Sequence, residues 1–333
     1  GVARAGAALP GAQLSWPGGW RGGALLALAT VLVLGALRLL RRRPWVAAGC
    51  AVLLLLALLR PPPAVRFMTG WPPPGWSYAM CDVGQGDATV LAAGPASAVV
   101  VDAGPDPALV DGCLRDLGVT RVPLLVLTHF HADHVTGLPG VLHGRTVSAI
   151  ETTTFPQPAG EAAFVRRTAG AAGVPLVPVV PGERRTTGPL AWRVLWPRAG
   201  PGAADGEPND SSVTLLVTVA HGPTLLLPGD LEPPAQRSLL RDENGLPHVD
   251  VLKVAHHGSA YQDPLLLSEL RPRLALISCG TGNPYGHPSP RTVGFLRAEG
   301  AAVLRTDKDG EIAVTGSGRA LRAVARRVDR STR

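Results

Sequence analysis

The sequence predicts an α/β domain built as a sandwich of two β-sheets with helices outside, preceded by two short apolar helices. The first observation is a change of pattern at residue 77, after which short β-branched runs alternate with helical stretches. The second is their order, because three successive strands followed by βα units are typical of two packed sheets. The third is composition. Of the 333 residues, 46% are hydrophobic and only 17% are charged, which excludes a disordered chain and indicates that part of it lies in a membrane.

The elements of the domain follow from the periodicity of its apolar residues. Strands are predicted at short β-branched runs bounded by turn residues, and Gly94-Pro95 between two of them indicates a hairpin. Helices are predicted where longer stretches separate these runs. We expect strands at 77–83, 88–93, 98–102, 124–127, 190–196, 212–219, 224–227, 249–254, 274–278 and 302–305, and helices at 107–117, 160–171, 232–241, 263–270 and 290–299.

Two apolar runs near the beginning of the sequence predict membrane-spanning helices. The run 23–40 is apolar apart from Arg38, and at about 1.5 Å per residue it nearly crosses a bilayer core of about 30 Å. The run 45–59 is shorter, about 22 Å as a helix, but a tryptophan and an arginine at its ends can anchor it. The alternative is two core helices of a soluble domain. The run Leu53–Leu56 disfavours this alternative because it has no polar face.

The positive charge of the chain is concentrated beside these runs. The net charge is +7, but residues 1–77 contain eight arginines and no acidic residue, which leaves −1 for residues 78–333. We therefore interpret the surplus as charge that flanks a membrane rather than as a nucleic-acid-binding surface. By the positive-inside rule, Arg41–Arg43 between the two runs is cytoplasmic. We thus expect a multi-pass protein of the cell membrane, with everything after residue 60 on the extracytoplasmic side.

Four segments are predicted along the chain. A linker rich in Pro and Trp separates the membrane part from the folded domain, and its partly polyproline-like character makes it stiff. The four cysteines include no CxxC pair, which excludes a cysteine-based zinc site and a disulfide-dense scaffold. The segments are a membrane region at 1–60, the linker at 61–76, the α/β domain at 77–325 and a basic tail at 326–333.

The strongest chemical signal follows the predicted strand 124–127. It reads His129-x-His131-x-Asp133-His134, so four potential metal ligands occupy six positions. Imidazole and carboxylate groups suit Zn²⁺ or Mn²⁺. In a loop at a strand end, His129 and His131 can bind one ion while Asp133 and His134 turn towards a second. A surface loop that is merely rich in histidine is the alternative, and the spacing disfavours it.

Two further segments place ligand residues after strands. The run 225–227 leads into Gly229-Asp230, and such an aspartate can bridge two metal ions about 3.5–4 Å apart. The strand 249–254 leads into His256-His257, and one of this pair can complete the second metal site. Solvated loop histidines are the alternative. Six of the nine histidines lie in strand-end segments, which favours one shared site, and they are residues 129, 131, 134, 256, 257 and 287.

Taken together, these motifs resemble those of the metallo-β-lactamase fold hydrolases. Asp102, within Val101–Gly104, resembles that family's strand-end aspartate, which supports a metal ligand. The resemblance implies an αββα sandwich and a metal-dependent hydrolase with two divalent metal ions, Zn or Mn.

A more specific resemblance covers about residues 77–325 and is to ComEC-type competence DNA-uptake proteins. It implies a membrane-tethered nuclease that degrades one strand of incoming DNA while the other passes through a channel. It also implies DNA as substrate and other competence DNA-uptake components as partners. The segments that carry it are Asp82–Asp87, Asn209–Ser212, Lys253–Ser259 and Asn283–Pro288.

The sequence departs from the general superfamily pattern at one point. The third histidine of the first metal site is absent between His134 and Asp230, where only His143 and His221 occur, each outside such a motif. The segment Asn209–Ser212 stands in that place. Either Asp210 ligates instead or the site is more open. More oxygen ligands would shift the preference from Zn²⁺ towards Mn²⁺.

Each candidate residue has a predicted role. Asp133 is the expected proton acceptor, and Asp230 would bridge the ions. His287 can protonate the leaving oxygen or contact phosphate. Lys253 can pair with phosphate or satisfy a buried carboxylate. The remaining site candidates are Asp82, Gln85, Asp87, Asn209 and Ser212, and for the first three a purely structural role is the alternative.

Two other functions are compatible with these motifs. One is hydrolysis of a small ester, thioester or lactone, because a fold does not fix its substrate. The other is a non-catalytic, metal-binding gate on a DNA channel. The nearly complete ligand set disfavours the gate. The apolar runs and the 82–87 and 209–212 segments favour the nuclease over the small-ester hydrolase.

Overall fold

The structure is a computed structural model that describes residues 69–198, 206–243 and 245–327, with scattered positions between 27 and 49. The chain divides into two compact units, Gly1–Ala64 and Val65–Arg333. Within the described residues, no helix has both the length and the apolarity needed to cross a membrane. The apolar runs 23–40 and 45–59 lie mostly outside the described residues, so the two membrane helices stay a prediction.

The first sheet of the larger unit has ten strands. Its order is β17-β16-β1-β2-β3-β5-β7-β8, with β4 and β6 forming a short ladder beside β3. Strands β3, β5, β7 and β8 run parallel, whereas β17, β16, β1 and β2 alternate in direction. The strands are β1 (Trp76–Met80), β2 (Thr89–Gly94), β3 (Ser97–Val101), β4 (Arg121–Val122), β5 (Leu125–Leu127), β6 (Thr146–Val147), β7 (Ile150–Thr152), β8 (Leu176–Pro178), β16 (Glu311–Thr315) and β17 (Arg322–Arg326).

The second sheet has seven strands in the order β15-β14-β13-β12-β11-β10-β9. Strands β12 to β15 run parallel, and β9 to β12 alternate in direction. The strands are β9 (Arg184–Thr187), β10 (Leu190–Trp196), β11 (Thr214–Val219), β12 (Thr224–Leu227), β13 (Val251–Lys253), β14 (Leu274–Ile277) and β15 (Ala302–Arg305).

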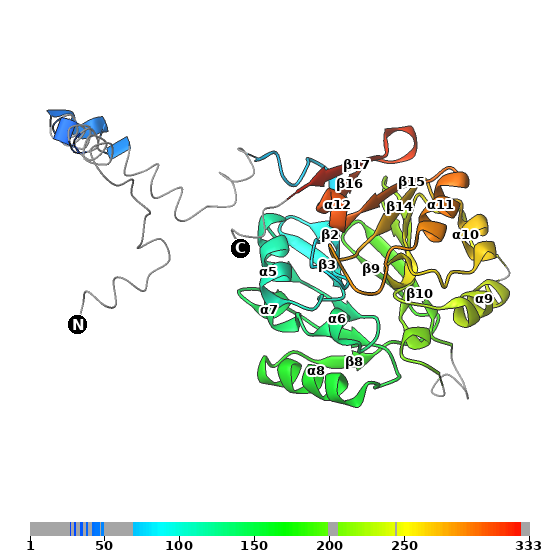
Figure 1. Cartoon of the computed structure of the whole chain (residues 1–333). Coiled ribbons are helices and arrows are strands. Elements are labelled where there is room, and N and C mark those ends of the chain that lie inside the picture. The colour runs from blue at the N-terminus through cyan, green and yellow to red at the C-terminus, as the bar shows by residue number, and fades with distance from the viewer. Residues whose placement is uncertain are drawn as a thin grey trace. The chain divides into compact units, whose positions relative to one another are not determined.

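Helices cover the outer face of each sheet, and the two groups lie on opposite sides of the sandwich (Figure 1). Several begin with a proline in their first turn, and Asp106, Asp263 and Ser289 cap three of them. The first group is α5 (Pro107–Asp116), α6 (Ala132–Val135), α7 (Leu138–Leu142) and α8 (Ala159–Ala171), and the second is α9 (Pro233–Asp242), α10 (Pro264–Leu270) and α11 (Pro290–Ala298). Shorter elements are α12 (Thr306–Asp309) and the 3-10 turns η1 (Asn209–Ser211), η2 (Ala255–Gly258) and η3 (Gly318–Ala320).

Alternation along the strands divides the core into three apolar layers. Tyr78 and Met80 of β1 point between the sheets, where they join Leu215 and Leu227 of the second sheet. Ala79, between them in sequence, faces the opposite way into the layer under α5 and α8. A third layer fills the space between the second sheet and α9 to α11. Because side chains in a strand alternate between faces, this pattern produces the predicted sandwich with helices outside.

Most predicted elements are confirmed to within one to three residues at their ends, and the hairpin between β2 and β3 is confirmed. Most elements that sequence analysis missed are short or lie at an edge of a sheet, although β16 has five residues, is largely buried and pairs with both β1 and β17. For example, β4 and β6 have two residues each, and β17 is mostly exposed. Such segments lack a clear apolar period of their own, because their pairing partners, rather than their own side chains, fix them as strands.

Candidate metal centre

The candidate site forms where the ends of strands from both sheets meet. Strands β3 and β5 of one sheet and β12, β13 and β14 of the other each end beside a polar residue at the same edge of the sandwich. Antiparallel β2 begins there. Local sequence explains this, since each apolar strand is followed at once by a polar turn. The residues concerned are Asp87 before β2, Asp102 after β3, the segment 128–134 after β5, Asp230 after β12, His257 after β13 and Ser278 after β14.

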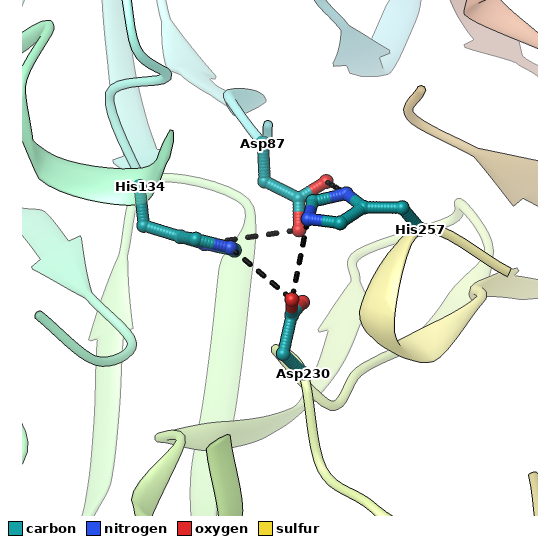
Figure 2. A group of neighbouring side chains, drawn as sticks. All are labelled: Asp87, His134, Asp230 and His257. Carbon is teal, nitrogen blue, oxygen red and sulfur yellow. Dashed lines mark ion pairs between the residues drawn. The ribbon is translucent and has the colours of Figure 1, made fainter. Parts of the chain in front are cut away.

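Four of these residues form a compact buried cluster. Asp87, His134, Asp230 and His257 each offer a ligand-type atom, and these atoms lie within 4.8 Å of one another. Figure 2 shows the two rings and the two carboxylates converging from four separate segments of the chain. Each of the four side chains is at most 3% exposed. A buried group of acids and imidazoles needs compensation, which a cation provides.

The two histidine rings give the cluster two sides. We call the side of their Nε2 atoms the front and the side of their Nδ1 atoms the back. On the front, the Nε2 atoms of His134 and His257 lie 3.3 and 3.2 Å from Asp230 Oδ2. Asp133 Oδ2 joins them, 3.9 Å from His134 Nε2 and 3.2 Å from His257 Nε2. Four ligands at about 2.1 Å from a tetrahedral ion would be about 3.4 Å apart. The front atoms therefore fit one divalent ion held by Asp133, His134, Asp230 and His257.

The back of each ring is held by a partner that fixes its orientation. His134 Nδ1 lies 2.9 Å from Asp102 Oδ2, and His257 Nδ1 donates to the Ser278 carbonyl at 3.0 Å. Acceptors at Nδ1 leave Nε2 free to bind a metal, which is the usual arrangement of metal-bound histidines. His134 Nε2 is buried and makes no hydrogen bond. The residues present thus fit a bound metal ion.

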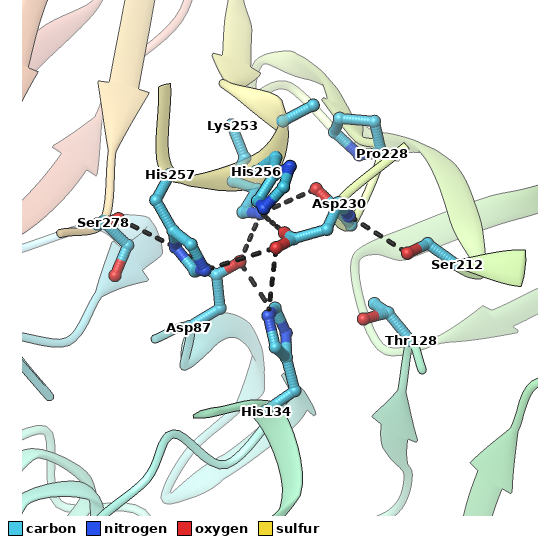
Figure 3. A network of polar contacts seen from close by, with 12 residues as sticks. Asp87, Thr128, His134, Ser212, Pro228, Asp230, Lys253, His256, His257 and Ser278 are labelled. Atoms are coloured by element: carbon cyan, nitrogen blue, oxygen red, sulfur yellow. Dashed lines mark hydrogen bonds and ion pairs between the residues drawn. The ribbon is translucent and has the colours of Figure 1, made fainter. Parts of the chain in front are cut away.

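Asp87 approaches the same rings from the back. Its oxygens lie 3.8 Å from His134 Nδ1 and 3.6 Å from His257 Nδ1, and it forms an ion pair with Lys253. Lys253 Nζ also donates to Asp230 Oδ1 at 3.1 Å and to the Gly229 carbonyl at 2.7 Å (Figure 3). In this structure Asp87 therefore supports the ligands, and Lys253 satisfies buried carboxylates.

A second group of ligand atoms is formed by the first two histidines of the motif. His129 Nε2 and His131 Nδ1 are 3.1 Å apart, so both can face one ion. The other nitrogen of His129 lies 3.1 Å from Thr128 Oγ1 and 3.3 Å from Ser212 Oγ. Ser212 Oγ also accepts from the Asp230 backbone N–H at 3.0 Å. Ser212 thus connects the two groups.

The backbone of the site adopts conformations that its sequence permits. Gly86 has φ +145°, and a Cβ at this position would lie 2.2 Å from the Asp133 carbonyl, so only glycine fits beside the motif. His256 and His257 have φ of 47° and 53°, in the left-handed region that favours glycine. Residues other than glycine that adopt such conformations are often found at functional sites, where surrounding contacts maintain the strained backbone.

Other predicted site residues lie around this centre rather than within it. His256 Nδ1 lies 3.2 Å from Glu232 Oε1, so of the His256-His257 pair only His257 faces the cluster. The Asp210 carboxylate accepts from the Glu232 backbone N–H at the start of α9. Gln85 accepts from the Gly280 N–H, which ties the 82–87 loop to the end of β14. Asp82 lines a neighbouring cavity of about 340 Å³.

Sequence analysis missed three features of the site. Glu232 contacts both His256 and Asn209, and its place two residues after Asp230 was its only signal. Ser278 contributes a backbone carbonyl, which no side-chain pattern reveals. Cys81 and Cys113 form a disulfide that ties the 82–87 loop to α5. Their pairing depends on a fold that brings residues 32 positions apart together.

The charges of the site shift the pKa values of its groups. Burial opposes the charged form of His134, but Asp230 and Asp102 outweigh it and raise the pKa of His134 well above its ordinary value. Burial also lowers the pKa of His257, but Asp230 and Asp87 outweigh burial and raise this pKa well above its ordinary value. Burial raises the pKa of Asp133, but His134 and His257 hold it below its ordinary value. A carboxylate with a low pKa is a weak base, which favours Asp133 as a ligand over the predicted proton acceptor.

These shifts predict that metal affinity depends on pH. With raised pKa values, the rings of His134 and His257 are protonated near neutral pH in the metal-free protein, and a metal ion must displace those protons. We expect affinity for Mn²⁺ or Zn²⁺ to rise with pH by up to about tenfold per pH unit for each proton displaced. Calorimetric titration in buffers of different ionisation enthalpy measures the released protons. Affinity that is independent of pH would contradict this assignment of charge.

Comparison with known proteins defines the family. A model described as the metallo-beta-lactamase superfamily matches residues 81–277, and the chain belongs to that superfamily. Membership indicates a metal-dependent hydrolase. The metallo-beta-lactamase fold protein YhfI from Bacillus subtilis is similar in structure over 68% of this chain and 95% of its own, with a TM-score of 0.44 and 8% identity.

Within the superfamily, the curated relatives include competence proteins. The chain is 32% identical to ComE operon protein 3 of Bacillus subtilis (strain 168) over 59% of its own length and 25% of that protein. It is 30% identical to Competence protein ComA of Neisseria gonorrhoeae over 86% of its own length and 38% of that protein. The predicted resemblance to ComEC-type competence proteins is confirmed. The chain spans well under half the length of these two relatives.

Proposed function

We propose that the protein is a metal-dependent nuclease that acts on DNA during competence-type DNA uptake and degrades one strand while the other is transported. The observation that carries the proposal is the front cluster of Asp133 with the buried His134, Asp230 and His257, found in a chain whose relatives include competence proteins. DNA is the proposed substrate. The membrane and other DNA-uptake components are the proposed partners.

The cluster suits phosphodiester hydrolysis. Two divalent cations, Zn or Mn, would supply Lewis acidity, which lets water act near neutral pH and offsets the charge of a phosphodiester. The chain's own residues would hold and orient this centre. Asp102 and Ser278 fix the two rings, Lys253 holds one oxygen of Asp230, and the other oxygen faces the front.

His287 lies beside the cluster and can meet the substrate. Its ring centroid is 5.3 Å from that of His256 and 6.3 Å from that of His257. Burial, followed by the charges of those two histidines, lowers the pKa of His287 to about 4. The ring is then neutral near neutral pH, and bound cations would lower its pKa further. Of its two predicted roles, contact with phosphate by hydrogen bonding is favoured over protonation of the leaving oxygen.

An extracytoplasmic, membrane-anchored location is also proposed. The sequence supports it through Arg41–Arg43 between the two apolar runs. The disulfide Cys81–Cys113 supports it independently, because disulfides persist in oxidising compartments and are rare in the cytosol.

The nuclease proposal is tested with the purified full chain loaded with Mn²⁺ or Zn²⁺. Single-stranded DNA, double-stranded DNA, a lactone and a thioester are offered in parallel. Cleavage of DNA that chelation abolishes is the expected result. Turnover of the lactone or thioester with every DNA form left intact would overturn the proposal in favour of a small-ester hydrolase. Metal binding without turnover of any substrate would favour a gate.

The location is tested by labelling in intact cells. Ser148 is exposed, so Ser148→Cys in a Cys50→Ala background is expected to react with a membrane-impermeant thiol reagent before permeabilisation. Cys279 is buried and the other two cysteines form the disulfide, so the background signal is low. Ser259 is 0% exposed, and Ser259→Cys is the matched control that stays unlabelled. Labelling of Ser148→Cys only after permeabilisation would place the domain in the cytoplasm.

A further inference from the structure

Apart from the bridging Asp230, the group formed by His129 and His131 has two ligand atoms and lacks the third that a three-histidine site would supply. Their facing nitrogens are 3.1 Å apart, and two imidazoles alone rarely hold a divalent ion in a catalytic site, where three protein ligands are usual. The two histidines between 134 and 230 lie elsewhere in the described structure. His143 is exposed and pairs with Asp111, and His221 lies in an exposed turn after β11.

The turn η1 brings another side chain to this position. The Asn209 side chain lies within hydrogen-bonding reach of the His131 ring and favours the charged form of that ring. The same turn places Ser212 Oγ 3.3 Å from His129 Nδ1, and it is closed by the Ser212 N–H donating to the Asn209 carbonyl at 3.0 Å. The segment that occupies the place of the missing histidine is therefore packed against both histidines of the first group.

The orientation of the Asn209 carboxamide is fixed by its other contact. Its Nδ2 donates to Glu232 Oε1 at 3.1 Å. A carboxylate only accepts hydrogen bonds, so this contact identifies the NH₂ end of the amide and directs the oxygen away from Glu232. That oxygen, Asn209 Oδ1, is buried, faces the His131 ring and is satisfied by no hydrogen bond of normal geometry. A buried carbonyl oxygen without a partner is destabilising unless something binds it.

The neighbouring aspartate is already engaged. Asp210 Oδ1 accepts from the Glu232 backbone N–H at 3.0 Å, and its backbone carbonyl accepts from Trp196 Nε1 at 2.6 Å. These bonds direct Asp210 towards α9 and β10. Asn209 Oδ1, by contrast, is buried without a hydrogen bond of normal geometry.

We propose that the Asn209 carboxamide oxygen takes the place of the missing third imidazole and, with the bridging Asp230, completes the ligands of a divalent metal ion bound by His129 and His131. The inference deepens the proposed function, because it rests on a centre of two ions and specifies the ligands of the first. A carboxamide oxygen is a harder ligand than an imidazole nitrogen. A site with this oxygen in place of a third imidazole therefore favours Mn²⁺ more than a three-histidine site does. Glu232 is then a positioning residue, since it holds the amide by its nitrogen.

The test measures metal content without substrate. The full chain is loaded with Mn²⁺, separated from free ions and analysed for metal, and Mn²⁺ affinity is measured by electron paramagnetic resonance. We expect two ions per chain in the wild type and one in Asn209→Ala. The affinity of the lost site should fall on the order of 10–100-fold, as when residues that support a metal are removed. Asn209→His should restore the second ion and shift the preference towards Zn²⁺.

The matched control is Asp210→Asn, one residue along the same turn. It is expected to keep both ions, because its engaged oxygen remains an acceptor. Denaturant unfolding of the metal-free Asn209→Ala protein, compared with that of the wild type, guards against a folding defect in the alanine variant. A wild type that binds a single ion, an Asn209→Ala that keeps two ions at wild-type affinity, or loss of an ion in Asp210→Asn alone would each overturn the assignment. Because no substrate is present, these outcomes are independent of whether DNA is cut.

Discussion

Replacing Asp230 by asparagine is expected to leave the protein nearly inactive on DNA, whichever of Mn²⁺ or Zn²⁺ is supplied. One Asp230 oxygen faces the Nε2 atoms of His134 and His257, and the other accepts from Lys253. A carboxylate at this position would bind both ions, so its loss removes the charge that holds them and the water they activate together. The variant should also retain less metal, which elemental analysis measures.

The matched comparison is His287→Ala. His287 lies beside the centre without joining it, so this variant should keep its metal and a residual rate. Loss of a single proton-transfer group or substrate contact typically costs about 10²–10⁴-fold, whereas loss of a metal site can abolish turnover. Single-turnover cleavage of labelled DNA by both variants decides the order. An Asp230→Asn protein that cuts DNA at the wild-type rate would disprove the bridging role even if the nuclease function stands.

Sequence analysis predicted those parts of the fold and site that local patterns encode. The β-branched runs gave the long strands, because alternation of buried side chains is written in the sequence itself. The placement of metal-ligand residues after strands also came from the sequence, since His129 and Asp230 each follow an apolar run. Parallel strands then bring their ends to one edge, so such residues meet without any long-range information.

The remaining features depend on contacts that sequence does not display. Which of His256 and His257 faces the cluster depends on two residues from different segments. Glu232 contacts His256, and the Ser278 carbonyl orients His257. The support that Lys253 gives to Asp87 joins two sheets. Ligation by Asp210 and a more open site were the two alternatives for the missing histidine, and which residue of a four-residue turn can face a metal depends on backbone geometry. These features depend on tertiary contacts, which local sequence patterns do not encode.

The pair formed by Lys253 and Asp87 predicts the largest effect on stability. Lys253 is 2% exposed and Asp87 is 1% exposed. Burial alone would lower the pKa of Lys253, but Asp87 and Asp230 raise it, so the ammonium stays charged. Replacing Lys253 by methionine removes that charge and leaves the Asp87 carboxylate buried without its partner. Breaking a buried ion pair on one side typically costs about 3–5 kcal/mol, a large share of the roughly 5–15 kcal/mol that holds a domain folded.

Denaturant unfolding of the metal-free full chain measures this loss, because bound cations would partly compensate for the missing ammonium. Lys253→Met is expected to lower the free energy of unfolding by about 3–5 kcal/mol. The double variant Lys253→Met with Asp87→Asn should recover part of it, since the second change removes the unpaired charge, while Asp230 keeps His134 and His257 as partners. Recovery of stability in the double variant would indicate a charge effect rather than a simple loss of packing, because a cavity left by lysine would remain in both variants. If Lys253→Met unfolds within about 1 kcal/mol of the wild type, or if the double variant is no more stable than the single one, the ammonium does not hold the carboxylates of this site together.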